Sequence, residues 1–429
     1  MPQEALAKTG VTVRVADAGD TVAGVQAKWV ALPESTEEVA ALLRVAAEHD
    51  LAVTPVGGGT KLDWGPPPER CDLLVDLCCL NEVLEYAPGD LVVRVQTGIT
   101  LDALNEHLAA ENQELALESP VPGTTVGGLL ATALSGPRRF RYGTPRDLVI
   151  GVTVVLADGT TARSGGKVVK NVAGYDLGKL FAGSYGTLGV ITEATFRLHP
   201  LPPARLWVTA TYPELGDAPG VDLGTLAVQL AASQAEPAAV ELDWSADSPG
   251  YTVSALLEGT AAPTKAETIR QVMTNPEISW SESPDGAARA EVSESPPDWW
   301  GRLPEGAILL EIRVPPSSAG AVVRELATSH LTGHTLRGSA ASGVFLLALP
   351  AGTPKAGTPE AETPATAATV IERLRERIEA LDGRLLAVSG PVGAADRWGT
   401  IGALDLMRRV KARFDPDRRM SPGRFVGGI

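Results

Sequence analysis

The spacing of apolar residues predicts alternating helices and strands in the first half of the chain. From Ser35 to Asp50, apolar residues recur at helical spacing behind a serine that is followed three residues later by Glu38, as in a capped helix. A second helix is predicted over residues 99–112, with Thr100 as its cap. Runs rich in β-branched residues predict strands at LAVTPVG, LVVRVQTG and LVIGVTVVLADGT. This alternation predicts the α+β class.

A proline-rich stretch, LHPLPPARLWVTA, predicts a domain junction just after residue 200. Beyond it, RLWVTATY and AAVELDW have the pattern of strands, whereas LGTLAVQLAASQ and VIERLRERIEAL have the pattern of helices. Residues 281–300 and 351–369 are polar and rich in proline or threonine, with few core residues, so they predict disordered or extended insertions.

Composition favours a large globular chain. With 429 residues, of which 44% are hydrophobic, the chain can bury the cores of two or three domains. No apolar run approaches the roughly 20 residues of a membrane-spanning helix, and MPQEALAKTG shows no secretory pattern. We therefore expect a cytoplasmic protein without a membrane span.

Cysteine usage gives no sign of a metal or disulfide framework. The 3 cysteines, Cys71, Cys78 and Cys79, lack the paired spacing of an iron–sulfur or zinc site. Because Cys78 and Cys79 lie in the apolar run DLLVDLCCL, they are predicted to be small buried hydrophobic residues.

Charge is distributed unevenly along the chain. The formal net charge is −15, yet residues 121–200 hold nine Lys and Arg against four acids. A positive segment within an acidic chain favours a small phosphate-bearing ligand over nucleic acid. The C-terminal residues 405–424 hold seven bases and three acids. There Arg408, Arg409 and Lys411 are predicted to form a solvated helix face, whereas the alternatives for Arg418, Arg419 and Arg424 are a solvated surface or a contact to a cofactor or partner.

Two glycine-rich loops carry the candidate chemistry. Gly57, Gly58 and Gly59 follow an apolar strand-like run, and Thr60 and Lys61 add a hydroxyl and a positive charge. Successive backbone amides in such a loop can hold an anion, although a triple glycine is also a common plain turn. The second loop is PGTTVGG, residues 122–128. Neither loop fits the G-x-G-x-x-G or Walker A pattern, so a Rossmann domain and a P-loop NTPase are both disfavoured.

These loops, followed by GTLGVIT at residues 186–192, resemble the PCMH-type FAD-binding domain of the vanillyl-alcohol oxidase superfamily. The resemblance implies an α+β fold with a two-subdomain FAD-binding domain, an α+β cap domain, and a C-terminal tail that returns to the FAD domain. It places an N-terminal extension at 1–27, the FAD-binding domain at 28–202, the cap at 203–385 with the 351–369 insertion, and the C-terminal segment at 386–429. The implied FAD contacts are Pro55, Val56, Gly57, Gly58, Gly59, Thr60, Lys61, Pro122, Gly123, Thr124, Thr125, Gly127, Gly128, Thr132, Ser135, Asp147, Gly189 and Val190.

Within this superfamily, LSGPRRFRYGTPRDLVIG and the tail FDPDRRMSPGRF most resemble the FAD-binding subunits E of glycolate oxidase. That resemblance implies a complex with a catalytic flavin subunit and an iron–sulfur subunit. Relatives with covalent FAD place a histidine in the first glycine loop, where this chain has Thr60. The resemblance therefore implies that FAD is bound non-covalently.

No catalytic residue can be assigned from the sequence. Of the 5 histidines, His330 and His334 are spaced i, i+4, but glycines interrupt the helix and no third metal ligand is evident, so they are interpreted as surface or structural residues. The favoured hypothesis is an electron-relaying FAD subunit. One alternative is a self-sufficient 2-hydroxy-acid or alcohol dehydrogenase that uses Tyr142, Tyr175, Lys167 or Lys170, although both tyrosines are interpreted as packing residues. Another is a structural or regulatory subunit that FAD only stabilises.

Overall fold

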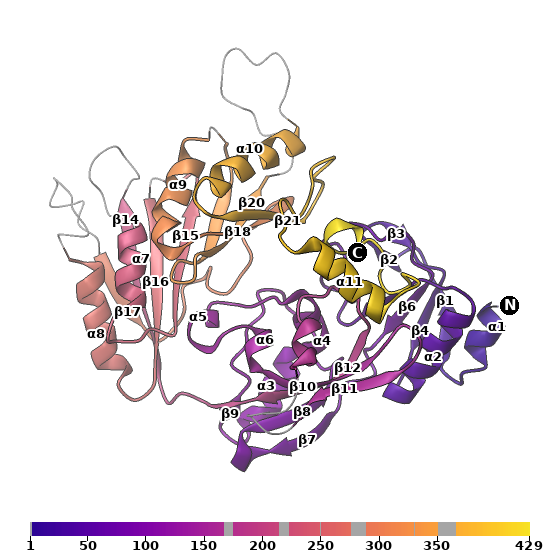
Figure 1. Cartoon of the computed structure of the whole chain (residues 1–429). Coiled ribbons are helices and arrows are strands. Elements are labelled where there is room, and N and C mark those ends of the chain that lie inside the picture. The colour runs from indigo at the N-terminus through magenta and orange to yellow at the C-terminus, as the bar shows by residue number, and fades with distance from the viewer. Residues whose placement is uncertain are drawn as a thin grey trace. The chain divides into compact units, whose positions relative to one another are not determined.

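The computed structural model describes residues 2–166, 175–213, 223–248, 250–275, 289–329, 331–350 and 366–429. The chain divides into two compact units. The first comprises residues 1–136, 142–201 and 401–429, and the second comprises residues 137–141 and 202–400. The first unit therefore includes both ends of the chain, which are drawn in indigo and yellow in Figure 1.

The first sheet of the first unit has the strand order β1-β4-β6-β5. Its strands β4, β6 and β5 run parallel, and β1 is antiparallel to β4. The bounds are β1 Thr12–Val15, β4 Trp29–Leu32, β5 Val53–Val56 and β6 Leu73–Asp76, with a small hairpin of β2 Thr21–Val22 and β3 Val25–Gln26. Residues 1–27, expected as an extension, thus contribute a helix and three strands here.

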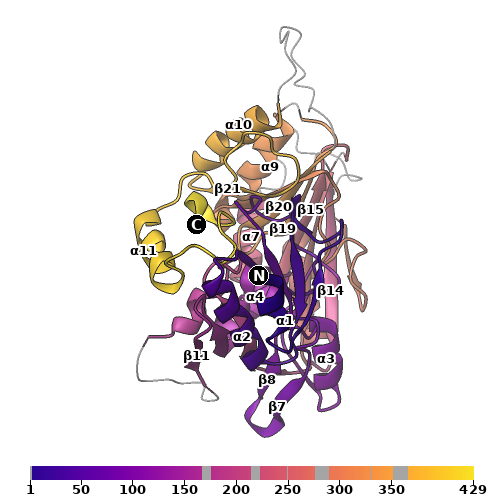
Figure 2. The same cartoon turned by 90° about the vertical axis from the view of Figure 1, so that its right-hand side faces the viewer.

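Helices α1 (Pro2–Ala7) and α2 (Thr36–Glu48) supply the core of this sheet (Figure 2). Leu6, Leu42 and Leu43 are fully buried in it. The predicted cap of α2 is confirmed, because the Ser35 hydroxyl accepts a hydrogen bond from the Glu38 amide at 3.1 Å. The Glu38 carboxylate in turn accepts from the Glu34 amide at 2.7 Å, so the start of the helix is satisfied on both sides.

The second sheet of this unit is antiparallel, with the order β11-β10-β12-β8-β7. Helix α3 (Leu101–Ala109) has the predicted cap, since the Thr100 hydroxyl accepts from the Ala103 amide at 3.2 Å. The strands are β7 Val83–Ala87, β8 Val92–Gln96, β10 Val149–Val155, β11 Thr161–Gly165 and β12 Val190–Arg197, and a separate pair is formed by β9 Gln113–Glu114 and β13 His199–Pro200. The helices are α3 Leu101–Ala109, α4 Val126–Thr132, α5 Arg139–Tyr142 and α6 Pro145–Leu148, with 3-10 turns η1 Pro88–Asp90 and η2 Leu177–Leu180.

The C-terminal segment returns to the first sheet. After α11 (Leu404–Phe414), residues 419–421 run parallel to β5: the Val53 amide donates to Arg419 and the Ser421 amide donates to Val53, both at 2.8 Å. Met420 is fully buried in the same core as α2. Both views show the yellow segment beside the indigo strands (Figure 1, Figure 2). The segment therefore pairs with the edge of β5, and η5 (Val426–Gly428) ends the chain.

The second unit is built on an antiparallel sheet of 8 strands in the order β17-β14-β16-β15-β19-β20-β18-β21. Along β15, Val240, Leu242 and Trp244 enter the core, whereas Glu241 and Asp243 alternate with them. The helices pack against that apolar face. The strands are β14 Arg205–Pro213, β15 Ala239–Ser245, β16 Gly250–Glu258, β17 Arg289–Ser293, β18 Ile308–Arg313, β19 Thr335–Ser339, β20 Val344–Leu349 and β21 Arg384–Ser389. The helices are α7 Leu223–Ala231, α8 Ala262–Met273, α9 Ala319–Ala327 and α10 Ala367–Glu379, with η4 at Pro316–Ser318.

Parts of the two predicted insertions are ordered elements. Arg289–Ser293 forms β17 on the edge of β14, and the Trp300 ring meets Trp207 edge-on at 6.2 Å, so of the two alternatives the extended one applies to residues 289–293. Thr366 caps α10, whose first turn takes up residues 367–369. Residues 281–288 and 351–365 lie outside the described residues.

The burial predicted for Cys78 and Cys79 was wrong. Strand β6 ends at Asp76, and the chain turns directly afterwards, with the Leu80 amide donating to the Leu77 carbonyl at 2.9 Å. That turn places both cysteines at the surface, whereas Cys71 is buried. The apolar run therefore extends beyond the strand it predicted.

Candidate cofactor site

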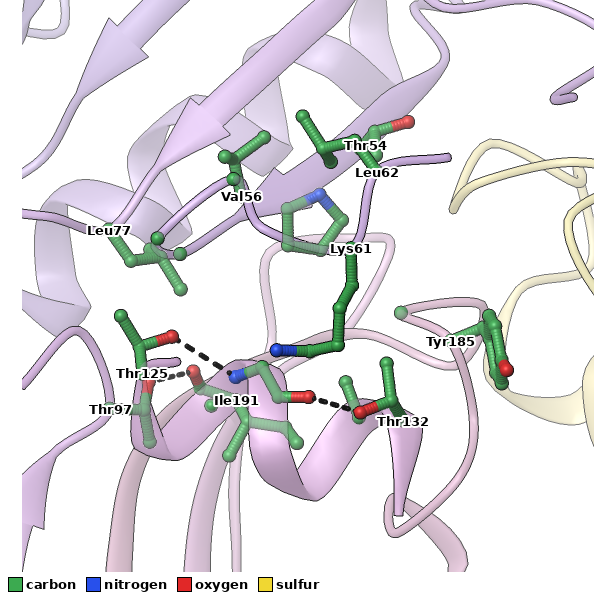
Figure 3. A pocket seen from close by; sticks show the side chains of 18 of the residues that line it. Thr54, Val56, Lys61, Leu62, Leu77, Thr97, Thr125, Thr132, Tyr185 and Ile191 are labelled. Carbon is green, nitrogen blue, oxygen red and sulfur yellow. Dashed lines mark hydrogen bonds between the residues drawn. The ribbon is translucent and has the colours of Figure 1, made fainter. Parts of the chain in front are cut away.

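A pocket in the first unit is lined mainly by loops and short side chains (Figure 3). The pocket opens to solvent, and the empty space between its walls and at its mouth amounts to about 820 Å³. The lining residues are Thr54, Pro55, Val56, Gly57, Gly58, Gly59, Thr60, Lys61, Leu62, Leu77, Thr97, Thr125, Gly127, Gly128, Ala131, Thr132, Tyr185, Gly186, Gly189, Ile191 and Arg424.

The first glycine loop continues directly from β5. A side chain at Gly57 would collide with the Thr125 hydroxyl, and one at Gly58 would collide with the Gly123 carbonyl. Gly59 has φ +67°, which favours glycine. Glycine is thus required at 57 and 58 because the first loop lies directly against the Thr125 side chain and the Gly123 backbone of the second.

Backbone donors remain available in this loop. Within the described part of the chain, the amides of Gly57, Gly58 and Gly59 donate to no protein acceptor. Consecutive unpaired amides are suited to an anionic ligand. The loop therefore has donors that a diphosphate could use.

Lys61 brings a buried positive charge to the pocket (Figure 3). Its ammonium donates to the hydroxyls of Thr60 at 3.0 Å and Thr124 at 2.9 Å. Its side chain meets no carboxylate among the described residues, and burial lowers the pKa of Lys61 to about 8. A buried cation without a protein anion is costly, so the site favours a ligand that carries negative charge.

The second loop enters helix α4. Thr125 caps this helix by accepting from the Gly128 amide at 3.2 Å, and the Thr132 hydroxyl donates to the Gly128 carbonyl at 2.7 Å. A side chain at Gly127 would come within 3.0 Å of Thr97. Gly128 lies beside Lys61, because a side chain there would approach the ammonium to 3.9 Å. The glycines keep the ligand side of this turn free of side chains.

The third wall precedes β12. Gly186 has φ +71°, and a side chain there would come within 3.2 Å of Pro55. The wall continues into β12 at Ile191, whose carbonyl accepts from the Thr97 hydroxyl at 2.5 Å. Residues from β5, α4, β12 and the turn after β8 thus surround one space.

The C-terminal segment contributes Arg424. Its guanidinium donates to the Pro66 carbonyl at 3.0 Å, and the residue is buried. Arg418 instead pairs with Glu69 at 2.7 Å, and Arg419 pairs with Asp417 at 2.6 Å. The sequence left open whether these three arginines lie on a solvated surface or contact a cofactor or partner. Arg424 is the one of the three that lines the pocket.

Several expected FAD contacts lie outside the pocket lining. Pro122, Gly123, Thr124, Ser135, Asp147 and Val190 are the six concerned. Thr124 holds the Lys61 ammonium, Asp147 caps α6 by accepting from Thr144 at 2.8 Å, and Val190 is fully buried in the core. The pocket also includes Leu77, Thr97, Ala131 and Tyr185, which no sequence motif marked. Leu77 and Thr97 are brought to the site from distant parts of the sequence, whereas Ala131 and Tyr185 lie close in sequence to the predicted loop residues Gly128 and Gly186.

The chemical alternatives named from the sequence fall in different places. The Tyr142 ring meets His199 edge-on at 4.8 Å, which confirms its packing role. Tyr175 is 92% exposed, so its predicted packing role was wrong. Fully buried His334 meets Trp244 edge-on at 5.2 Å, and burial lowers its pKa, as expected of a structural residue. Lys167, Lys170 and His330 lie outside the described residues.

Comparison with known families identifies the domain around this pocket. Residues 27–165 match the family model described as FAD binding domain. The chain carries an FAD-binding domain. Its cofactor is thus FAD, as the resemblance implied.

Curated relatives that match part of the chain are named as hydroxy-acid enzymes. The glycolate oxidase subunit GlcD of Bacillus subtilis is 40% identical over 188 residues, covering 43% of this chain and 39% of the relative. D-lactate dehydrogenase [cytochrome] 1, mitochondrial, of Saccharomyces cerevisiae is 35% identical over 192 residues, covering 44% of this chain and 32% of the relative. The match thus spans 39% and 32% of the length of these two relatives.

Solved structures share the fold across nearly the whole chain. 4-Ethylphenol oxidase from Gulosibacter chungangensis superposes with a TM-score of 0.70 at 17% identity, covering 99% of this chain and 96% of that one. Glucooligosaccharide oxidase from Acremonium strictum gives 0.66 at 16% identity, covering 98% and 97%. The predicted α+β class and the resemblance to this type of FAD-binding domain are confirmed. Among the described residues, no helix has the length and apolarity to cross a bilayer, and no three side chains are grouped as metal ligands.

Proposed function

We propose that the protein is an FAD-dependent oxidoreductase, and that it acts as the FAD-binding subunit of a glycolate-oxidase-like complex. The observation that carries this proposal is the pocket of the FAD-binding domain, where, among the residues that the structure describes, Lys61 is buried without an acidic partner and the amides of residues 57–59 are unpaired. The expected partners are a catalytic flavin subunit and an iron–sulfur subunit. A relative named as a glycolate oxidase subunit supports this assignment.

The residues present fit an FAD with an anionic diphosphate. Lys61 and the amides of residues 57–59 would hold the negative charge, and the glycines at 127 and 128 would let the ligand approach the backbone. Thr54, Leu77 and Ile191 would exclude water from one side. When bound, FAD supplies a hydride acceptor for the oxidation of a 2-hydroxy acid.

Non-covalent attachment is part of the same proposal. Glucooligosaccharide oxidase from Acremonium strictum holds a 6-S-cysteinyl, 8α-N1-histidyl FAD. In the part of the chain that the structure describes, neither a cysteine nor a histidine lines the pocket. We therefore expect acid or denaturant to release intact FAD. A cytoplasmic location remains a prediction from the sequence.

A second candidate is a self-sufficient FAD-dependent 2-hydroxy-acid dehydrogenase. It is favoured by relatives named D-lactate dehydrogenase and D-2-hydroxyglutarate dehydrogenase, the latter from Xanthomonas citri and 39% identical over 185 residues. In that case the chain alone would both bind and oxidise the substrate.

Anaerobic flavin absorbance separates these functions. The purified chain is mixed with glycolate or D-lactate, first alone and then with candidate catalytic and iron–sulfur subunits. Bleaching only with partners is the expected result, whereas bleaching by the chain alone would establish the self-sufficient dehydrogenase. Bound flavin that never bleaches would indicate a structural or regulatory subunit, and a protein that binds no flavin would overturn the cofactor assignment.

A further inference from the structure

A buried ion pair lies where the C-terminal segment leaves helix α11. The Lys411 ammonium and the Asp415 carboxylate are 2.6 Å apart, and their side chains are 5% and 0% exposed. All other residues of α11 are at least partly exposed. The sequence predicted that Lys411 would lie on a solvated face of this helix, and that prediction was wrong. A lysine that is the one fully buried residue of a polar helix needs a specific reason to be there.

Both members of the pair are fully satisfied. Asp415 also accepts from the amides of Arg419 at 2.9 Å and Met420 at 2.7 Å. Lys411 also donates to the carbonyls of Thr187 at 2.7 Å and Met420 at 2.8 Å, which uses all its protons. Removing either partner would leave a buried charge uncompensated.

These bonds join three segments that reach the FAD pocket. Thr187 lies between Gly186 and Gly189, which both line the pocket. Arg419 and Ser421 pair with Val53, and β5 then continues into the first glycine loop. Beyond Ser421, the same segment carries Arg424 into the pocket. The ion pair therefore lies at the junction of the first loop, the third wall and the C-terminal segment.

We propose that Lys411 and Asp415 are positioning residues that dock the C-terminal segment against β5, so that docking and FAD retention are coupled. The inference rests on the FAD assignment made in the proposed function. Neither residue lines the pocket, and both act through the backbone that they hold. Such coupling is reciprocal: the docked segment tightens FAD binding, and bound FAD keeps the segment docked.

Two substitutions and a matched control test the coupling. Lys411→Met and Asp415→Asn each break the buried pair. Asp405→Asn breaks the pair between Arg408 and Asp405, which lies on the same helix but has side chains 55% and 96% exposed. The FAD dissociation constant of each full-length apoprotein is measured by quenching of flavin fluorescence, and its folded fraction is checked by urea unfolding.

We expect the dissociation constant to rise about tenfold or more in Lys411→Met and Asp415→Asn, and to stay unchanged in Asp405→Asn. A purely structural pair would lower the urea midpoint yet leave the affinity of the folded protein unchanged, and that result would overturn the proposal. If wild type binds FAD but no 2-hydroxy acid reduces it even with candidate partner subunits present, the proposed function fails while the coupling is still tested by the variants. If wild type binds no FAD, both fail.

Limited trypsin digestion provides a second readout that needs no variant. The segment carries Arg408, Arg409, Arg413 and Arg418, and all four are exposed. Cleavage at these sites is followed in wild-type apoprotein with and without saturating FAD. FAD should slow cleavage severalfold if binding and docking are coupled, whereas an equal cleavage rate in both samples would contradict the coupling even if the variants failed to fold.

Discussion

Lys61 is the residue whose surroundings say most about the ligand. Its charge is buried, its two partners are neutral hydroxyls, and its pKa is lowered to about 8 by burial. An anion bound nearby favours the charged form and therefore raises this pKa. At a pH where Lys61 of the free protein is neutral, binding of FAD should accordingly be accompanied by the uptake of a proton.

This linkage predicts how FAD affinity depends on pH. Below about pH 8 Lys61 is already charged, so the dissociation constant should be flat; above it, the constant should rise by up to about tenfold per pH unit. Lys61→Met should weaken binding at neutral pH by about 1.5–3 kcal/mol and abolish the rise. Fluorescence titrations from about pH 6.5 to about pH 9 measure both effects. Exposed Lys8 offers the control Lys8→Met, and an unchanged slope in Lys61→Met would exclude Lys61 as the titrating group.

The cysteines illustrate a residue-scale property that local sequence did not determine. Cys78 and Cys79 continue an apolar run, yet β6 ends at Asp76, and Cys71 alone is buried. Alkylation of the native protein should therefore add two groups, and unfolding should expose the third thiol. Intact mass and peptide mapping would locate them. Although Cys78 is exposed, partial desolvation of its thiol and then the negative charge of Asp76 raise its pKa to about 12, so its alkylation should accelerate with pH. Modification of Cys71 in the native state would contradict the assigned burial.

At the scale of elements, short-range signals were the most predictable. The caps of α2 and α3 follow from Ser35 and Thr100, because a cap is decided by residues within one turn. The glycine loop at 57–59 was marked for the same reason. Strand β17 and the pocket residue Thr97 were not predicted, because both depend on pairing with strands distant in sequence. Lys411 was missed because helical periodicity identifies faces but cannot reveal that a separate loop covers a lysine.

Helix α4 offers a test of the second loop. In Gly128→Val the first side-chain carbon would stand 3.2 Å from the Thr125 hydroxyl and 3.9 Å from the Lys61 ammonium, so bulk would enter the ligand side of the turn. We expect at least about tenfold weaker FAD binding, and an intermediate loss in Gly128→Ala, which gains about 0.5–1 kcal/mol in helix propensity. Gly89→Val is the control because its added carbon meets nothing within 4 Å. Full flavin occupancy in Gly128→Val would remove this turn from the proposed site.

For the whole molecule, the division into two units does not follow chain order. The first unit takes residues from both ends, whereas the second is almost entirely the continuous stretch 202–400. A junction near residue 200 was expected from the prolines, and a returning tail was implied by the resemblance. The return point at residue 401 has no comparable sequence signal, since it depends on where the chain meets β5 and the 184–189 segment again.

Removing residues 401–429 should therefore destabilise the unit at the other end of the sequence. The deletion takes away the pairing with Val53, the buried Met420, and the Lys411–Asp415 pair, all of which belong to the first unit. The second unit keeps its own sheet and helices. Hydrogen exchange measured by mass spectrometry should show lost protection in β5 and β6, with β15 and β16 protected as in the full chain. Equal loss of protection in both sets of strands would instead mean that the two units unfold as one cooperative structure. Destabilising the first unit would then lower the unfolding free energy of the second unit as well.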